Sequence, residues 1–232
     1  MFALAACAQG APGHDEPADF DPVDWSGGKA DAGGSAVFDK NTIMTELVFG
    51  TSSAVDADAV QQFLEDNPYG RRSWLADVQL DGVRFSDELV EVAQQHDLDP
   101  VVLLARMQVE TSLVSATARP SSFRIAHALG CGCPDSSGCS SADSGLDTQL
   151  QCAGDVLSRA LQGSRDGSGG WVAGASHRTD DGYRVTPSDD ATAALYAYTP
   201  WVLVGSGGNW LVWNVTRKYL KHFDQAGTLQ LP

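Results

Sequence analysis

The stretch that decides the fold is LDPVVLLARMQVETSL, residues 98–113. Asp99 is a good helix cap, and Pro100 suits the first turn of a helix, where its missing N–H is not needed. The residues that follow are apolar on nearly every side, which is typical of a helix that runs through a protein core. We therefore predict a buried helix over residues 101–114, with Glu110 near its end.

The rest of the chain predicts further helices around that one. Apolar residues recur at helical spacing, or follow helix-capping residues, in six other segments. These segments cover residues 56–67, 86–98, 120–129, 147–162, 188–198 and 208–223. Residues 75–85 predict an irregular or hairpin-like link, and residues 163–187 predict a long surface loop or a short hairpin. The pattern indicates one mainly α domain over residues 41–232.

Charge and hydropathy exclude two classes of partner. The net charge is −15, with 15 Lys and Arg against 30 Asp and Glu, so no basic surface is available to bind phosphates and nucleic acid is not expected. No run of about 18 apolar residues is present, so we expect no membrane-spanning helix. A chain of 232 residues has room for one ordinary domain and a tail. We expect the protein to be a monomer.

Residues 1–40 differ in composition from the body. The start, MFALAAC, resembles a bacterial lipobox in which Cys7 receives lipid, although it lacks the basic region of a full signal peptide; a chance cysteine is the alternative. Residues 8–40 are rich in Gly, Ala, Pro and Asp and predict a disordered acidic linker. We therefore expect an exported protein, secreted or anchored to the membrane only through Cys7.

The other four cysteines are Cys131, Cys133, Cys139 and Cys152, an even set within a short stretch. Two disulfides are expected, as in exported proteins. A direct Cys131–Cys133 bond would strain the chain, which leaves two pairings open, with each of these cysteines joined to Cys139 or Cys152. A four-thiolate zinc site is the alternative, but the C-x-C-x5-C-x12-C spacing lacks the paired CxxC of structural zinc sites. The histidines are scattered, so we predict no metal and no cofactor.

Glu110 is the strongest candidate for a catalytic residue. At 100° per residue it falls on the same helix face as the apolar Leu103 and Met107. Such a setting raises the pKa of a carboxyl group, and a carboxyl that keeps its proton near neutral pH can protonate a glycosidic oxygen. Arg106, four residues earlier, offers a simpler alternative, a helical salt bridge without catalysis. The residues alone leave both interpretations open.

Three motifs in order resemble the lysozyme-like superfamily, in particular its soluble lytic transglycosylases. Residues 98–113 resemble their catalytic helix, which ends in a glutamate followed by small hydroxyl residues, here Glu110-Thr111-Ser112. ALGCGCPD at residues 128–135 lies where those proteins carry a glycan-binding turn that contains glycine, although their usual Met-Gln pair is absent. ATAALYAYTPW at residues 191–201 resembles the motif that packs over the catalytic glutamate, and residues 210–223 resemble the helix after it. Residues 56–224 as a whole also resemble a group of bacterial secreted proteins.

The resemblance implies a mainly α, lysozyme-like (transglycosylase-type) domain with a disulfide-stapled loop that cleaves peptidoglycan glycan strands. It implies Glu110 as the acid and later the base. The substrate-binding residues that it implies are Tyr196, Tyr198, Gln108, Asp135 and Gln149. Each of these residues also has a simpler alternative role. The two tyrosines would pack in the core, Gln108 would be a polar residue on the flank of its helix, and Asp135 would only shape the loop that the cysteines at 131–152 close, called the cysteine loop below.

Two outcomes of cleavage and one role without catalysis are open. A lytic transglycosylase needs only one carboxylate, because the substrate's acetamido group and 6-hydroxyl complete the reaction and give 1,6-anhydro-muramyl ends; we expect this outcome. A muramidase or glucosaminidase needs a second carboxylate, about 5 Å away for retention or about 6.5–9.5 Å for inversion. The candidates for it are Asp135, Asp143, Asp147 and Asp155.

A glycan-binding surface protein without activity would hold Glu110 in a two-point pair with Arg106, with no open groove beside it. A metal-dependent wall hydrolase is not indicated, because no HExxH is present.

Overall fold

The computed structural model describes residues 38–50, 54–133 and 138–227. Within these ranges the chain is mainly helical, as the sequence predicts. The longer helices are α2 (Ala57–Glu65), α3 (Phe85–Gln95), α4 (Pro100–Thr111), α6 (Leu146–Arg165), α7 (Asp190–Tyr198) and α8 (Gly208–Gln225). The short ones are α1 (Glu46–Phe49), α5 (Ser122–Ala126) and the 3-10 turns η1 (Trp74–Asp77) and η2 (Ser141–Asp143). The predictions for Cys7, Asp135 and the linker up to residue 37 fall outside the described residues; residues 38–40, predicted as linker, contact the body through Phe38 on Trp213 and the carbonyl of Lys40.

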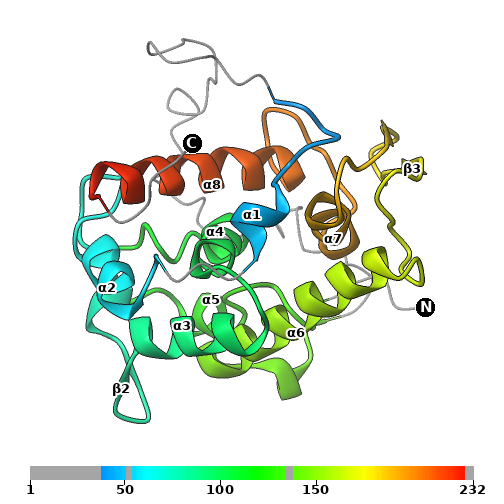
Figure 1. Cartoon of the computed structure of the whole chain (residues 1–232). Helices are drawn as coiled ribbons and strands as arrows, with labels where there is room; N and C mark the ends of the chain where they lie inside the picture. Colours follow the sequence, from blue (N-terminus) through cyan, green and yellow to red (C-terminus); the bar gives the residue numbers. More distant parts are fainter. Residues whose placement is uncertain (1–37, 51–53, 134–137, 228–232) are drawn as a thin grey trace.

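Helix α4 lies in the middle of the molecule, with α8 along one side and α3 and α6 along the other (Figure 1). Every residue from Pro100 to Gln108 is buried, as the apolar pattern predicts. The Asp99 side chain caps the helix by accepting a hydrogen bond from the N–H of Val101 at 2.9 Å. The helix ends at Thr111 rather than Val114, because Ser112 adopts a left-handed conformation with φ of 53°. The central helix was therefore predicted correctly, apart from its last turn.

The other helices enclose α4 in pairs: α6 packs on α7, α2 packs on α3, and α3 also contacts α6 (Figure 1). The contact between α3 and α6 depends on Gly154. A Cβ atom at this position would lie 2.5 Å from Cδ2 of His96, so only glycine lets the two helices approach this closely. Each large apolar side chain buried between helices contributes about 1.5–3 kcal/mol to stability.

Two hairpins connect the helices. In the first, β1 (Gln79–Leu80) pairs with β2 (Val83–Arg84) through an Asp-Gly turn with φ of 51° and 87°, the backbone that this dipeptide favours in hairpins. In the second, β3 (His177–Arg178) pairs with β4 (Arg184–Val185). Both lie where the sequence left a hairpin open. Helix α3 follows β2 directly: Arg84 is its N-cap and Phe85 its first residue, one residue before the start of the predicted segment 86–98.

Two disulfides join the cysteines, Cys131 to Cys152 and Cys133 to Cys139, which is one of the two pairings left open. The zinc alternative is wrong for this form of the chain, because all four sulfur atoms are in disulfide bonds. Disulfides are typical of oxidising compartments. Among the described residues, no helix combines the length and the apolar character needed to cross a membrane.

Candidate active site

Glu110 lies in the last turn of α4, and its side chain is only 5% exposed. Its Oε1 atom accepts a hydrogen bond from Nη2 of Arg106, which lies one turn earlier and is fully buried. The helical salt bridge offered as the simpler alternative is therefore present. An ion pair of this kind stabilises the ionised carboxylate and compensates the cost of burying its charge.

Arg106 also connects α4 to the end of α7. Its Nη2 donates to Oγ1 of Thr199 at 2.8 Å, and its guanidinium carbon lies 4.3 Å from the centre of the Tyr198 ring. Nε and Nη1 of Arg106 have no hydrogen-bond partner within the described part of the chain. The pair with Glu110 is therefore formed through one guanidinium nitrogen and lacks the two-nitrogen fork that would mark a purely structural arginine–carboxylate pair.

Gly130 brings a second segment against the Glu110 carboxylate. Its φ of 69° lies in the left-handed region, and a Cβ atom there would be 2.9 Å from Oε2 of Glu110. Any other residue would push the carboxylate or the turn aside. Thr111 strengthens this contact, because its hydroxyl donates to the carbonyl of Ala128 at 2.8 Å. The turn after Ala128 is thus fixed next to the end of α4.

Tyr198 contributes a third segment. It is buried, and its hydroxyl donates to the carbonyl of Leu129 at 2.8 Å. Burial raises the pKa of the Tyr198 hydroxyl above its ordinary value; the Arg106 charge opposes this rise and the Glu110 charge adds to it. Tyr198 is therefore a neutral donor that holds the turn beside Glu110 at every physiological pH.

Tyr196 faces another part of the molecule. Two residues apart on a helix, Tyr196 and Tyr198 point about 200° apart. The Tyr196 hydroxyl donates to the carbonyl of Lys40 at 2.8 Å, and its ring stacks on Trp171 with centroids 4.8 Å apart. Of the two tyrosines predicted to lie near Glu110, Tyr198 contacts Arg106 and the turn beside the carboxylate, and Tyr196 lies in packing contacts elsewhere.

Both glutamines predicted to contact a saccharide form internal hydrogen bonds instead. Gln108 bonds to the hydroxyl and the N–H of Ser115 and holds the turn that follows α4. Gln149 is fully buried and bonds to backbone groups of Leu129, Cys131 and Asp143. A sugar would reach Gln149 only if the turn at Leu129 moved, and saccharide contact stays a prediction for both glutamines.

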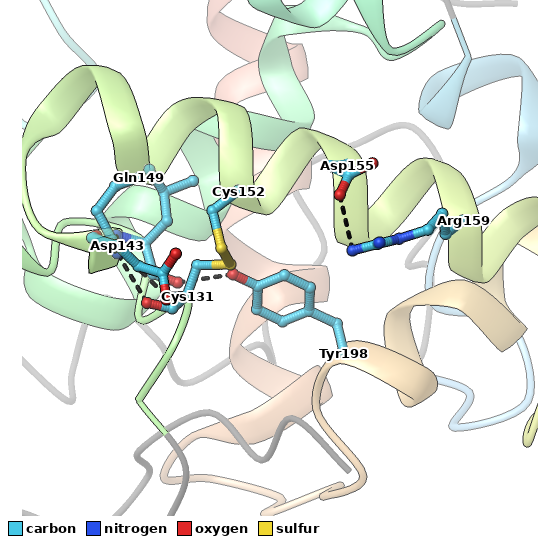
Figure 2. The surroundings of a disulfide bond; sticks show 8 residues. Cys131, Asp143, Gln149, Cys152, Asp155, Arg159 and Tyr198 are labelled. Atoms are coloured by element: carbon cyan, nitrogen blue, oxygen red, sulfur yellow. Dashed lines mark hydrogen bonds and ion pairs between the residues drawn. A yellow bond between two sulfur atoms is a disulfide. The ribbon is translucent and has the colours of Figure 1, made fainter. Parts of the chain in front are cut away.

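Figure 2 shows how the cysteine loop is attached to α6. The Cys131–Cys152 disulfide, the Gln149 amide and the Tyr198 hydroxyl all converge on the same turn. Among the candidates for a second carboxylate, Asp143 lies against this loop, because a Cβ on Gly132 would be 2.3 Å from its Oδ2.

Of the other candidates for the second carboxylate, Asp135 lies outside the described residues, and Asp147 and Asp155 have partners within α6. Asp155 pairs with Arg159 at 2.7 Å on α6, and the Asp147 side chain bonds to the hydroxyl of its neighbour Thr148.

Two contributors to the site were not singled out from the sequence, Gly130 and Thr199. Gly130 lies within the predicted glycan-binding turn, and a glycine between Leu129 and Cys131 was the available signal. Nothing in the residues around Thr199 indicates its bond to Arg106, because 93 positions separate the two in sequence. No protein-family model, curated protein or solved structure matches this chain.

Proposed function

We propose that this chain is an exported lysozyme-like enzyme that cleaves the glycan strands of peptidoglycan, with Glu110 as the acid and then the base. The observation that carries the proposal is the close approach of Gly130 to Glu110: a Cβ atom added to Gly130 would lie 2.9 Å from Oε2 of Glu110. The three motifs that resemble lytic transglycosylases are far apart in sequence. In the folded chain Gly130 nevertheless lies against Glu110, and Tyr198 reaches the same region through its ring on Arg106 and its hydroxyl bond to Leu129.

The chemistry needs one carboxyl group in two protonation states. In the first step the Glu110 carboxyl gives its proton to the glycosidic oxygen, and the bond from that oxygen to C1 of the muramyl sugar breaks. The substrate's acetamido group stabilises the positive charge on C1. In the second step the 6-hydroxyl attacks C1 and returns its proton to Glu110. The product has a 1,6-anhydro-muramyl end, and no water is consumed.

Arg106 favours the second of these states. After the first step Glu110 is ionised, and the guanidinium stabilises the carboxylate until it accepts the proton of the 6-hydroxyl. For the first step Glu110 must be protonated and must therefore lose the charge attraction of Arg106. The single-nitrogen geometry of the pair suits this exchange better than a two-nitrogen fork, since one hydrogen bond between the two side chains has to weaken instead of two.

A non-catalytic, glycan-binding protein is the second candidate. The observation that favours it is the burial of the Glu110 side chain, which is 5% exposed and paired with a fully buried arginine. A hydrolase is the alternative within the enzyme class, and Asp143, which lies against Gly132 two residues after Gly130, is its candidate second carboxylate.

Digestion of purified peptidoglycan separates these candidates. We expect the wild type to release muropeptides with anhydro ends, and Glu110→Gln to lower the rate by at least about 100-fold. Glu91→Gln is the matched control, because Glu91 is an exposed glutamate on α3.

Mass spectrometry of the released products identifies their ends. Equal release by the wild type and Glu110→Gln would rule out the catalytic role, and reducing ends would replace the transglycosylase with a hydrolase. Binding without any release would favour the non-catalytic protein.

A further inference from the structure

The turn formed by Leu129, Gly130 and Cys131, called the 129–131 turn below, is the part of the cysteine loop that touches Glu110. Gly130 supplies the contact with the carboxylate. The backbone groups on either side of Gly130 are hydrogen-bonded within the protein, those of Leu129 and Cys131 to side chains from α6 and α7. The position of the turn therefore depends on residues that do not touch Glu110.

Gln149 of α6 is the main contact that fixes this turn. Its Oε1 accepts from the N–H of Leu129 at 3.0 Å and from the N–H of Cys131 at 3.1 Å. Its Nε2 donates to the carbonyl of Cys131 at 2.7 Å and to that of Asp143 at 2.5 Å. One fully buried amide thus holds both sides of Gly130. Buried hydrogen bonds of this kind are costly to break, because the freed groups find no water.

The Cys131–Cys152 disulfide adds a covalent connection from the same helix. Cys152 lies three residues after Gln149, so both side chains project from one face of α6. Figure 2 shows the disulfide and the amide approaching the turn side by side, with the Tyr198 hydroxyl opposite. The Cα atoms of Cys131 and Cys152 are 6.0 Å apart. The second disulfide, Cys133–Cys139, joins two residues of the loop to each other.

We propose that Gln149 and the Cys131–Cys152 disulfide are positioning residues, which hold Gly130 against Glu110 and thereby fix the orientation of the carboxyl group. This inference rests on the proposed function. The Glu110 side chain has rotatable bonds of its own, and its Oε2 side is bounded by the turn. If the turn retreats, the carboxyl group gains alternative orientations, and a displacement of about 1 Å is enough to lower a rate by roughly 100-fold.

The first test compares two glutamines of α6. Gln149→Met keeps the approximate length of the side chain and removes its hydrogen bonds to the turn; Gln151→Met is the control, because Gln151 is exposed and bonds to His96 and Gln95. We expect Gln149→Met to lower kcat by about 100-fold with little change in KM. We expect Gln151→Met to keep both constants. Unchanged kcat in a folded Gln149→Met would overturn the inference.

The second test removes one disulfide at a time. Cys131→Ala with Cys152→Ala frees the turn from α6, whereas Cys133→Ala with Cys139→Ala leaves that connection in place. We expect kcat to fall about tenfold in the first double variant and to stay close to the wild type in the second, a difference that a nonspecific loss of covalent bonds would not produce. Equal kcat values in the two double variants contradict a positioning role. This comparison also decides the question if Gln149→Met does not fold.

A measurement without substrate separates this inference from the proposed function. The carboxyl carbon of Glu110 gives a 13C NMR signal, which is assigned by its loss in Glu110→Gln. We expect this signal to shift in Gln149→Met and in the Cys131/Cys152 double variant, and to stay in place in Gln151→Met. If the wild type does not cleave peptidoglycan, the proposed function fails, and the 13C signal still decides whether the turn orients Glu110. An unmoved signal in both variants refutes the inference.

Discussion

Helix α4 carries a buried carboxyl group at each end, and the two are accommodated in different ways. Asp99 precedes the first turn and is 3% exposed, and Glu110 lies in the last turn with a side chain that is 5% exposed. At the start of the helix the free backbone N–H groups favour a negative charge, whereas at its end the free carbonyl groups oppose one. The same burial therefore demands more compensation at Glu110 than at Asp99.

Asp99 relies on the backbone alone. It accepts the N–H of Val101, and no cation pairs with it among the residues that the structure describes. Burial raises the pKa of the Asp99 carboxyl to about 7, and the bond from Val101 only partly opposes the rise. Glu110 has the guanidinium of Arg106 instead. The comparison teaches that backbone groups can accommodate a buried carboxyl at the start of a helix, whereas a carboxylate at its end needs a cation, here supplied from one turn earlier in the same helix.

The largest expected effect comes from removing the cation. Arg106→Met leaves the Glu110 charge buried without its partner, and we expect the free energy of unfolding at neutral pH to fall by about 4 kcal/mol. The double variant Arg106→Met, Glu110→Gln has no buried charge and should lose roughly half as much or less. Urea unfolding followed by circular dichroism measures both. Equal losses in the single and double variants would show that the pair does not compensate the charge of Glu110.

A smaller effect is expected at the contact between Gly130 and Glu110. Gly130→Ala adds a Cβ atom 2.9 Å from Oε2 on a backbone with φ of 69°, and strain and crowding together should cost about 3 kcal/mol. Gly70→Ala is the matched control, because φ is 70° and the added Cβ would meet nothing within 4 Å. It should cost only about 1 kcal/mol. Thermal unfolding of the two variants measures the difference, and equal losses would mean that Glu110 yields freely to the turn.

The same contrast explains how much was predictable from the sequence. The start of α4 depends on Asp99 and Pro100, which are adjacent in the chain, so the cap and the first turn were predicted correctly. The end of α4 depends on a left-handed residue at Ser112, and serine gives no signal for that conformation. Helix α1 was missed because its four residues are too few to show a periodicity.

The candidate site was predictable only in part. The pair of Arg106 with Glu110 follows from their spacing on one helix. The bonds from Gln149 to Leu129 and Cys131 join residues about 20 positions apart, and those from Arg106 to Thr199 join still more distant ones. No local pattern records such contacts. The resemblance implies Gln149 as a substrate contact, and nothing in the residues around it indicates that its amide bonds to a turn of the chain.

The smallest expected effect concerns Asp99 and depends on pH. The unfolded chain releases the Asp99 proton near the ordinary pKa of 3.8, and the folded protein releases it at about 7. Between these values the folded state binds more protons, so the contribution of Asp99 to stability falls as pH rises through this window and stays low above it. Asp99→Asn cannot ionise, yet asparagine caps a helix as well as aspartate does.

We therefore expect Asp99→Asn to have the same unfolding free energy as the wild type at pH 4 and a value about 2 kcal/mol higher at pH 8. This gain is roughly half of what the full pKa shift would give, because the helix N-terminus favours a negative charge and so lowers the cost of ionised Asp99. Chemical unfolding at several pH values measures this difference. Asp97→Asn, at an adjacent turn that does not cap α4, serves as the control and should show no comparable gain. If the stability difference between Asp99→Asn and the wild type is the same at pH 4 and pH 8, Asp99 is already ionised in the folded protein. The start of α4 would then tolerate a buried charge without a cation, and the contrast with Glu110 would rest on helix polarity alone.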